Sequence, residues 1–254
     1  MRFGADGISI IGPDQGIERW AAAARLACRD VVSDPKMVET WLQCEGTWFV
    51  GVDALPNDRF GDIGDVPFPQ VLQDHFGGDK HPAQLSIMYP GYPKPRAGES
   101  DAAFGYRVRR DAAHVDGILA IGPDRRRFVK EPHAYILGIP VTQCGQGASP
   151  MVIWRGSHHI MRAAFRDAFD GCDPADWSNI DVTEAYTTAR KKVFETCDRD
   201  IVHVDVGCAY AIHPLMLHGV SAWEQGADAP EDGRIIAYFR PQLSRVVDWI
   251  NCPD

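Results

Sequence analysis

Short apolar segments separated by glycine, proline and aspartate fill most of the chain after His81, and this pattern restricts the fold more than any other feature. Runs of this length and spacing predict antiparallel strands that pack as a sandwich or barrel. The runs are AQLSIMY, FGYRVRR, RFVK, HAYILGIPV, SPMVIWR, IVHVDV, CAYAIH and RIIAYFR. We therefore predict a mainly β fold over residues 81–245, with helices flanking it.

The residues before His81 follow a different pattern. GIERWAAAARLACRDVV repeats apolar residues at helical spacing and predicts a helix that begins near Pro13. MVETWLQ and PFPQVLQDHF predict shorter helices, GTWFVGVDALP predicts a strand, and IMRAAFRDAF and TEAYTTARKKVFETC predict helices within the β region. Because no repeat or linker divides the chain, we expect one domain over residues 1–254, in which the mostly helical residues 1–80 pack on the β core.

Composition narrows the class of partner. A net charge of −9 argues against nucleic acid, because a phosphate backbone is bound by a basic surface. Seven cysteines without C-x-x-C spacing indicate the unpaired thiols of a cytoplasmic protein. No signal peptide is recognisable, and no apolar run approaches the roughly 20 residues of a membrane span. We expect a cytoplasmic protein that binds a small-molecule substrate and neither nucleic acid nor membrane; the sequence leaves a homo-oligomer open.

His114-Val115-Asp116 is the first candidate for a metal site. Residues i and i+2 of a strand face the same side, so an imidazole and a carboxylate can reach one ion. Two histidines and one carboxylate on one face of an octahedron are the ligands of non-haem iron(II) oxygenases. His203-Val204-Asp205 repeats the motif. The first motif is favoured, because the third ligand must come from a distant strand. The chain after Asp116 is long enough to form the β core before such a strand, whereas the chain after Asp205 is too short.

His213 and His218 compete to be that third ligand. They would face opposite sides of one regular strand, but Pro214 interrupts the regularity, so parity does not decide between them. His218 is favoured by its setting, because Arg234 opens the next apolar run. A guanidinium there can bind a carboxylate through two parallel hydrogen bonds.

Several stretches together resemble the phytanoyl-CoA dioxygenase family of iron(II)/2-oxoglutarate oxygenases: AAHVDG, SPMVIWRGSHHIM, HPLMLHGVSAW and RIIAYFRP. The resemblance implies a double-stranded β-helix, that is, a jelly roll of cupin-like type. It implies that His114, Asp116 and His218 bind iron(II) and form the catalytic centre, and that Arg234 binds the co-substrate 2-oxoglutarate. The separation between His218 and Arg234 is longer than the family pattern, which makes Arg240 the reserve.

The same resemblance implies a dioxygenase that consumes O2 and hydroxylates its substrate, because family members that halogenate replace the metal carboxylate with a small residue. It does not select the substrate. One alternative is a cupin-like metal-dependent dioxygenase or isomerase that does not use 2-oxoglutarate; another is a binding protein that has kept only the fold. The arginines at positions 107, 109, 110 and 125–127 can contact a substrate anion or form a solvated surface.

Overall fold

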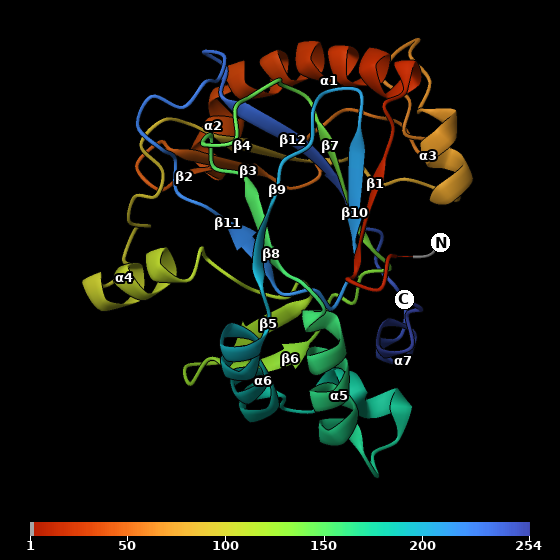
Figure 1. The fold of residues 1–254 in the computed structure, drawn as a ribbon, viewed down its shortest axis with the longest axis vertical. Coiled ribbons are helices and arrows are strands. Elements are labelled where there is room, and N and C mark those ends of the chain that lie inside the picture. The colour runs from red at the N-terminus through yellow and green to blue at the C-terminus, as the bar shows by residue number, and fades with distance from the viewer. Residues whose placement is uncertain (1–2) are drawn as a thin grey trace.

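The computed structural model describes residues 3–254 and places most strands in two facing antiparallel sheets (Figure 1). The larger sheet has the order β1-β10-β7-β12-β4-β3-β2, and the smaller has the order β11-β8-β9. The strands of the larger sheet are β1 (Ile8–Ile11), β2 (Leu42–Gln43), β3 (Trp48–Gly51), β4 (Gln84–Met88), β7 (Ile136–Pro140), β10 (Ala209–Ile212) and β12 (Arg234–Phe239). Those of the smaller sheet are β8 (Met151–Trp154), β9 (Arg199–Val202) and β11 (His218–Val220).

The order in which the chain visits the two sheets defines the fold. After β4 in the larger sheet, His114 forms a bridge to His218 at the edge of the smaller sheet, and β7 returns to the larger one. The chain then passes through β8 and β9 of the smaller sheet, β10 of the larger, β11 of the smaller and β12 of the larger. This alternation is a double-stranded β-helix, so the predicted fold class is confirmed.

The last strand of the larger sheet shows how the sequence sorts side chains between its two faces. Ile236 and Tyr238 of β12 belong to the apolar cluster between the sheets, whereas Ile235, Ala237 and Phe239 belong to the cluster on the outer face. Successive side chains of a strand point to opposite faces. By this parity the side chain of Arg234, which begins the strand, shares the inner face with Ile236 and Tyr238, and so does that of Arg240, which directly follows the strand.

Helices cover the outer faces (Figure 1). The long α1 (Gln15–Ser33) packs on the larger sheet, where Trp20 contacts Phe239 with ring centroids 5.8 Å apart. α5 (Ser157–Phe169), α6 (Thr183–Thr196) and the hairpin of β5 (Ile118–Ile121) and β6 (Arg126–Val129) form the layer beside the smaller sheet. The remaining helices are α2 (Pro35–Trp41), α3 (Gln70–His75), α4 (Asp101–Arg109), α7 (Val246–Ile250) and the 3₁₀ helix η1 (Pro174–Asn179).

One segment differs from its predicted structure. FGYRVRR was expected to form a strand, but residues 104–109 of it lie in α4 and Arg110 caps the C-terminal end of that helix. Ser100 caps this helix by accepting a hydrogen bond from the Ala103 amide, and Asp101 in the first turn and Arg107 in the last complement the helix dipole. The alternating aromatic and β-branched residues suggested a strand, and the capping signals outweigh them.

No helix within residues 3–254 is long and apolar enough to cross a membrane. The seven cysteines are all free thiols, three of them buried: Cys28, Cys44 and Cys252.

Candidate metal centre

Pairing of distant backbone segments brings the first two histidines together. His114 and the first residue of β11, His218, exchange two backbone hydrogen bonds, with N···O distances of 2.8 and 3.0 Å. Residues that pair directly across antiparallel segments hold their side chains close together. The two imidazole centroids lie 4.5 Å apart. Asp116, two residues after His114, reaches the same point, so the three predicted ligands form one cluster whose ligand atoms all lie within 4.8 Å of one another.

Hydrogen bonds fix which nitrogen of each ring faces the cluster. Nδ1 of His114 lies 3.0 Å from the Ala112 carbonyl oxygen, and Nδ1 of His218 lies 2.9 Å from the Met216 carbonyl oxygen. A carbonyl can only accept, so both Nδ1 atoms carry the proton and donate it. Both Nε2 atoms face the same carboxylate oxygen, Oδ1 of Asp116, at 3.1 Å from His114 and 3.7 Å from His218.

The charge states follow from burial and neighbours. Burial, and then the proximity of His114, lowers the pKa of His218 to about 4, so this imidazole is neutral at pH 7. Burial alone would raise the pKa of the Asp116 carboxyl, but Arg240, His114 and His218 hold that pKa well below its usual range. At neutral pH the lone pair of His218 Nε2 therefore faces an ionised oxygen, and two acceptors in this position repel each other unless a cation lies between them.

Arg240 holds the other oxygen of the carboxylate. Its Nη1 donates to Oδ2 of Asp116 at 2.9 Å, and its Nη2 donates to Gln84. Oδ1 is thereby left to the cluster. Metal ligands are commonly oriented by such a second layer of hydrogen bonds, which also keeps the ligand charged. The donor set is thus two imidazole nitrogens and one carboxylate oxygen, the combination that suits iron(II) with open coordination positions.

Arg240→Gln tests this orienting role. We expect the variant to bind iron(II) about 10- to 100-fold more weakly, the typical effect of losing an outer-shell partner of a metal ligand. Anaerobic titration of iron(II) into the metal-free protein measures the affinity. Arg245→Gln is a matched control, because Arg245 is exposed, forms an ion pair with Asp248 and does not line the triad cavity. Unchanged iron(II) affinity in Arg240→Gln would show that Asp116 binds the metal equally well without the hydrogen bond from Arg240.

The second H-x-D motif lies outside the cluster. His203 Nε2 contacts the Cys144 carbonyl oxygen at 2.9 Å, and Oδ1 of Asp205 accepts a hydrogen bond from Gln143 at 2.5 Å. His203 and Asp205 therefore have hydrogen-bond partners of their own, away from the triad.

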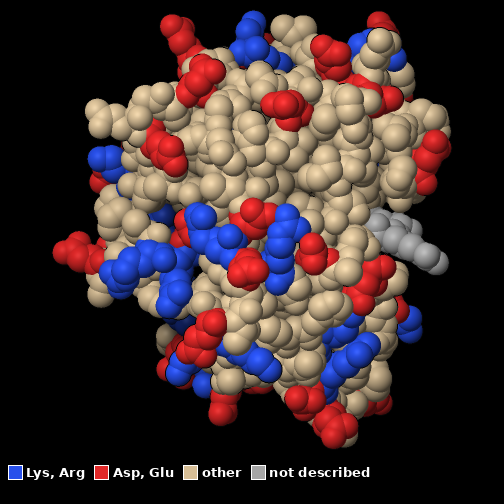
Figure 2. Space-filling model, in the orientation of Figure 1, with Lys and Arg blue, Asp and Glu red and all other residues tan. Residues whose placement is uncertain are grey.

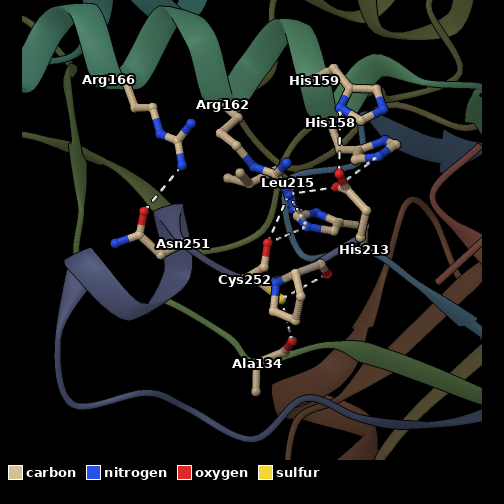
Figure 3. Close-up of polar contacts among 11 residues, drawn as sticks. Ala134, His158, His159, Arg162, Arg166, His213, Leu215, Asn251 and Cys252 are labelled. Carbon is tan, nitrogen blue, oxygen red and sulfur yellow. Dashed lines mark hydrogen bonds and ion pairs between the residues drawn. The ribbon is translucent and has the colours of Figure 1, made fainter. Parts of the chain in front are cut away.

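His213 also lies elsewhere, in a polar cluster between α5 and the C-terminal segment (Figure 3). Its Nε2 lies 2.8 Å from Nη2 of Arg162, and its Nδ1 accepts a hydrogen bond from the Leu215 amide. Its ring packs on that of His158, with centroids 4.7 Å apart.

His158, His159 and Asp254 also place ligand atoms within 4.8 Å of one another. Arg162 already occupies the Asp254 carboxylate at 2.8 Å, and its positive charge disfavours a metal ion there.

The buried pair His158 and His213 predicts acid sensitivity. Burial, and then neighbouring charged or titratable groups, lowers the pKa of His158 to about 4 and that of His213 to about 3. An imidazole in the unfolded chain titrates near 6.5, so between about pH 6.5 and 4 the unfolded chain binds protons that the folded chain does not. The free energy of unfolding should therefore fall as the pH falls, by at most about 1.4 kcal/mol per pH unit for each ring.

Urea unfolding of the metal-free protein at pH 7 and pH 5 measures this dependence. His213→Asn should reduce the difference between the two pH values, whereas His75→Asn, on the exposed end of α3, should leave it unchanged. An equal pH dependence in the parent and in His213→Asn would contradict the prediction.

Arg234, which begins β12, and Arg240, which directly follows it, have different surroundings. Arg240 lies at the triad, as described above. Arg234 is buried and lines a small cavity of about 20 Å³ together with Tyr210. The hydroxyl groups of Tyr210 and Tyr238 form a hydrogen bond with an O···O distance of 2.7 Å. Tyr238 also lines a second cavity, and the triad lies in the lining of that cavity. The tyrosine pair thus lies between Arg234 and the triad cavity, and binding of 2-oxoglutarate by Arg234 stays a prediction.

The triad cavity has a volume of about 540 Å³, enough for small organic molecules. Some of the residues that line this cavity were not predicted from the sequence. Tyr186 and Arg190, four residues apart on α6, both reach the backbone of the first motif: the Tyr186 hydroxyl accepts from the Val115 amide, and Arg190 donates to the Ala113 carbonyl. Buried His133 lines the cavity too. The helical spacing of Tyr186 and Arg190 was the available signal, but nothing local showed what the helix would face.

No family model and no curated protein matches the chain. Among solved structures, similarity extends to the non-haem α-ketoglutarate-dependent carbocyclase SnoK from nogalamycin biosynthesis, with 12% identity, 93% of this chain and 80% of that chain covered, and a TM-score of 0.48. Similarity also extends to AviO1 from Streptomyces viridochromogenes Tue57, with 15% identity and a TM-score of 0.44; the match covers 94% of this chain and 91% of that chain.

Proposed function

We propose that this protein is an iron(II)- and 2-oxoglutarate-dependent dioxygenase that hydroxylates a small organic molecule. The observation that carries the proposal is the convergence of His114 Nε2, His218 Nε2 and Asp116 Oδ1 on one point, with both Nδ1 protons bound to backbone carbonyls. Three acceptors held this way fit a divalent cation, and two imidazoles with one carboxylate fit iron(II).

Each residue has a separate part in this function. His114, Asp116 and His218 would hold the metal from one side, and Arg240 would orient the carboxylate. The side chains of His218 and Asp116 are 6% and 8% exposed, whereas that of His114 is 48% exposed, and all three line the triad cavity. When bound, iron(II) and 2-oxoglutarate supply the oxidising chemistry, and the protein supplies orientation and a shielded pocket.

The test is co-substrate dependence. The full-length protein, loaded with one equivalent of iron(II), should convert 2-oxoglutarate to succinate in air, and a screen of small organic acids should find compounds that accelerate this conversion. Anaerobic addition of 2-oxoglutarate should produce a metal-to-ligand charge-transfer band. Iron binding without this band or succinate would favour the alternative, a cupin-like metal-dependent dioxygenase or isomerase that does not use 2-oxoglutarate.

A further inference from the structure

The triad cavity is basic, although the chain as a whole carries a net charge of −9. Its lining contains two carboxylates, Asp116 and Glu131. Against these stand six arginines: Arg96, Arg107, Arg110, Arg127, Arg190 and Arg240. Figure 2 shows basic side chains, with acidic ones among them, across the middle of one face, next to α4, while the part of that face over the larger sheet carries mainly acidic ones. A cavity of one sign concentrates ligands of the opposite sign.

Two of these arginines are already neutralised. Arg107 forms a two-point ion pair with Glu99, at 2.8 and 2.7 Å, and Arg240 pairs with Asp116. The other four, Arg96, Arg110, Arg127 and Arg190, have no carboxylate within ion-pair distance in the part of the chain that the structure describes. The cavity therefore contains unneutralised positive charge.

Arg110 and Arg190 share one aromatic ring. The Cζ atoms of Arg110 and Arg190 lie 4.3 and 5.6 Å from the centroid of Phe194. Both guanidinium groups thus lie within cation–π distance of the same ring, and two like charges so placed repel each other without an anion nearby. Nε of Arg190 is buried and has no hydrogen-bond partner among residues 3–254. Arg190 also donates to the carbonyl of Ala113, the residue before His114, so this pair lies beside the metal motif.

We propose that the substrate carries a doubly charged oxyanion, a phosphate ester or a paired carboxylate, which Arg110 and Arg190 bind while its organic part lies in the cavity near the triad. The guanidinium fork matches the oxygens of either group. Trp48, Tyr106 and Tyr186 line the same cavity and suit an apolar or aromatic body. The claim that this anion is part of the substrate rests on the proposed function. The claim that the cavity binds such an anion is independent of the proposed function.

Three probes of similar size test the proposal by isothermal titration calorimetry: phenyl phosphate, phthalate and the neutral benzyl alcohol. The full-length protein is used both metal-free and loaded anaerobically with iron(II) and 2-oxoglutarate. In both forms we expect at least one anion to bind about tenfold or more tightly than benzyl alcohol, because hydrogen bonds to charged groups have this strength. The tighter anion identifies a phosphate or a paired carboxylate. Equal binding of all three probes would overturn the proposal.

Substitutions then locate the site. Arg110→Gln and Arg190→Gln should each weaken binding of the tighter anion by about 10- to 100-fold. Arg109→Gln is the matched control, since Arg109 lies on exposed α4 and does not line the cavity. The side chain of Arg110 donates no hydrogen bond within residues 3–254, so its substitution should leave the backbone of the metal motif untouched even if Arg190→Gln perturbs it.

The 2-oxoglutarate charge-transfer band separates this proposal from the proposed function. It should be unchanged in Arg110→Gln. If Arg110→Gln weakened 2-oxoglutarate binding and left the tighter anion unaffected, the arginines would belong to the co-substrate and the proposal would be wrong. If the band were absent from every protein, the co-substrate assignment would fail, and anion binding by the metal-free protein would still be measured.

Discussion

Asp116→Ala and His218→Ala are each expected to weaken iron(II) binding by more than about 100-fold and to abolish succinate formation. Loss of an outer-shell partner already costs about 10- to 100-fold in metal affinity or activity, and loss of a ligand removes a bond to the ion itself. Asp116 supplies the negative charge of the triad, and His218 is held in its neutral form with Nε2 facing the site. Anaerobic iron(II) titration and a succinate assay measure the two effects.

The chain provides matched controls for both variants. Asp205→Ala removes the carboxylate of the second H-x-D motif, and His213→Ala removes the competing histidine; neither residue lies in the triad. We expect both controls to bind iron(II) like the parent, while His213→Ala lowers the free energy of unfolding because its buried ring packs on His158. If iron(II) binding were lost in Asp205→Ala and retained in Asp116→Ala, the metal would be bound by the second H-x-D motif and the assignment to the first would be wrong.

Arg234→Ala is expected to weaken 2-oxoglutarate binding by some tens to thousands of fold, if Arg234 holds the distal carboxylate. Removing one partner of a buried charge pair costs roughly 2–5 kcal/mol, and about 1.4 kcal/mol corresponds to a factor of ten. Iron(II) affinity should barely change. Lysine should restore only part of the affinity, because an ammonium lacks the planar fork of the guanidinium. The charge-transfer band in an anaerobic titration reports the affinity.

Tyr238→Phe is an informative companion variant. Its hydroxyl bonds that of Tyr210, and this pair lies between Arg234 and the triad cavity. Altered 2-oxoglutarate binding in both Tyr238→Phe and Arg234→Ala would indicate that the co-substrate extends past the tyrosines. Parent-like binding in Arg234→Ala together with weak binding in Arg240→Ala, at equal iron(II) occupancy, would assign the distal carboxylate to Arg240. If neither arginine mattered, the 2-oxoglutarate assignment itself would fail.

Local pattern in the sequence was sufficient for most strands of the β core. The alternation along RIIAYFR sorts side chains to two faces, and the structure places them on those faces in β12. Capping was not weighed in the segment FGYRVRR, where Ser100 and Asp101 begin a helix. β5 and the short β11 were not recognised as strands, because strands of four and three residues carry little periodicity of their own.

The sequence by itself determined the types of ligand and the candidates for them, because a motif with a spacing of two fixes that His114 and Asp116 share a side. Only the tertiary structure decided which distant histidine joins them, since the pairing of His218 with His114 depends on the register of strands far apart in the chain. The same packing turned Arg240 towards Asp116, enclosed Arg234 behind two tyrosines and gathered arginines from α4, β6 and α6 around one cavity. Periodicity specifies which face a side chain occupies; what that face meets is set by how the sheets and helices pack together.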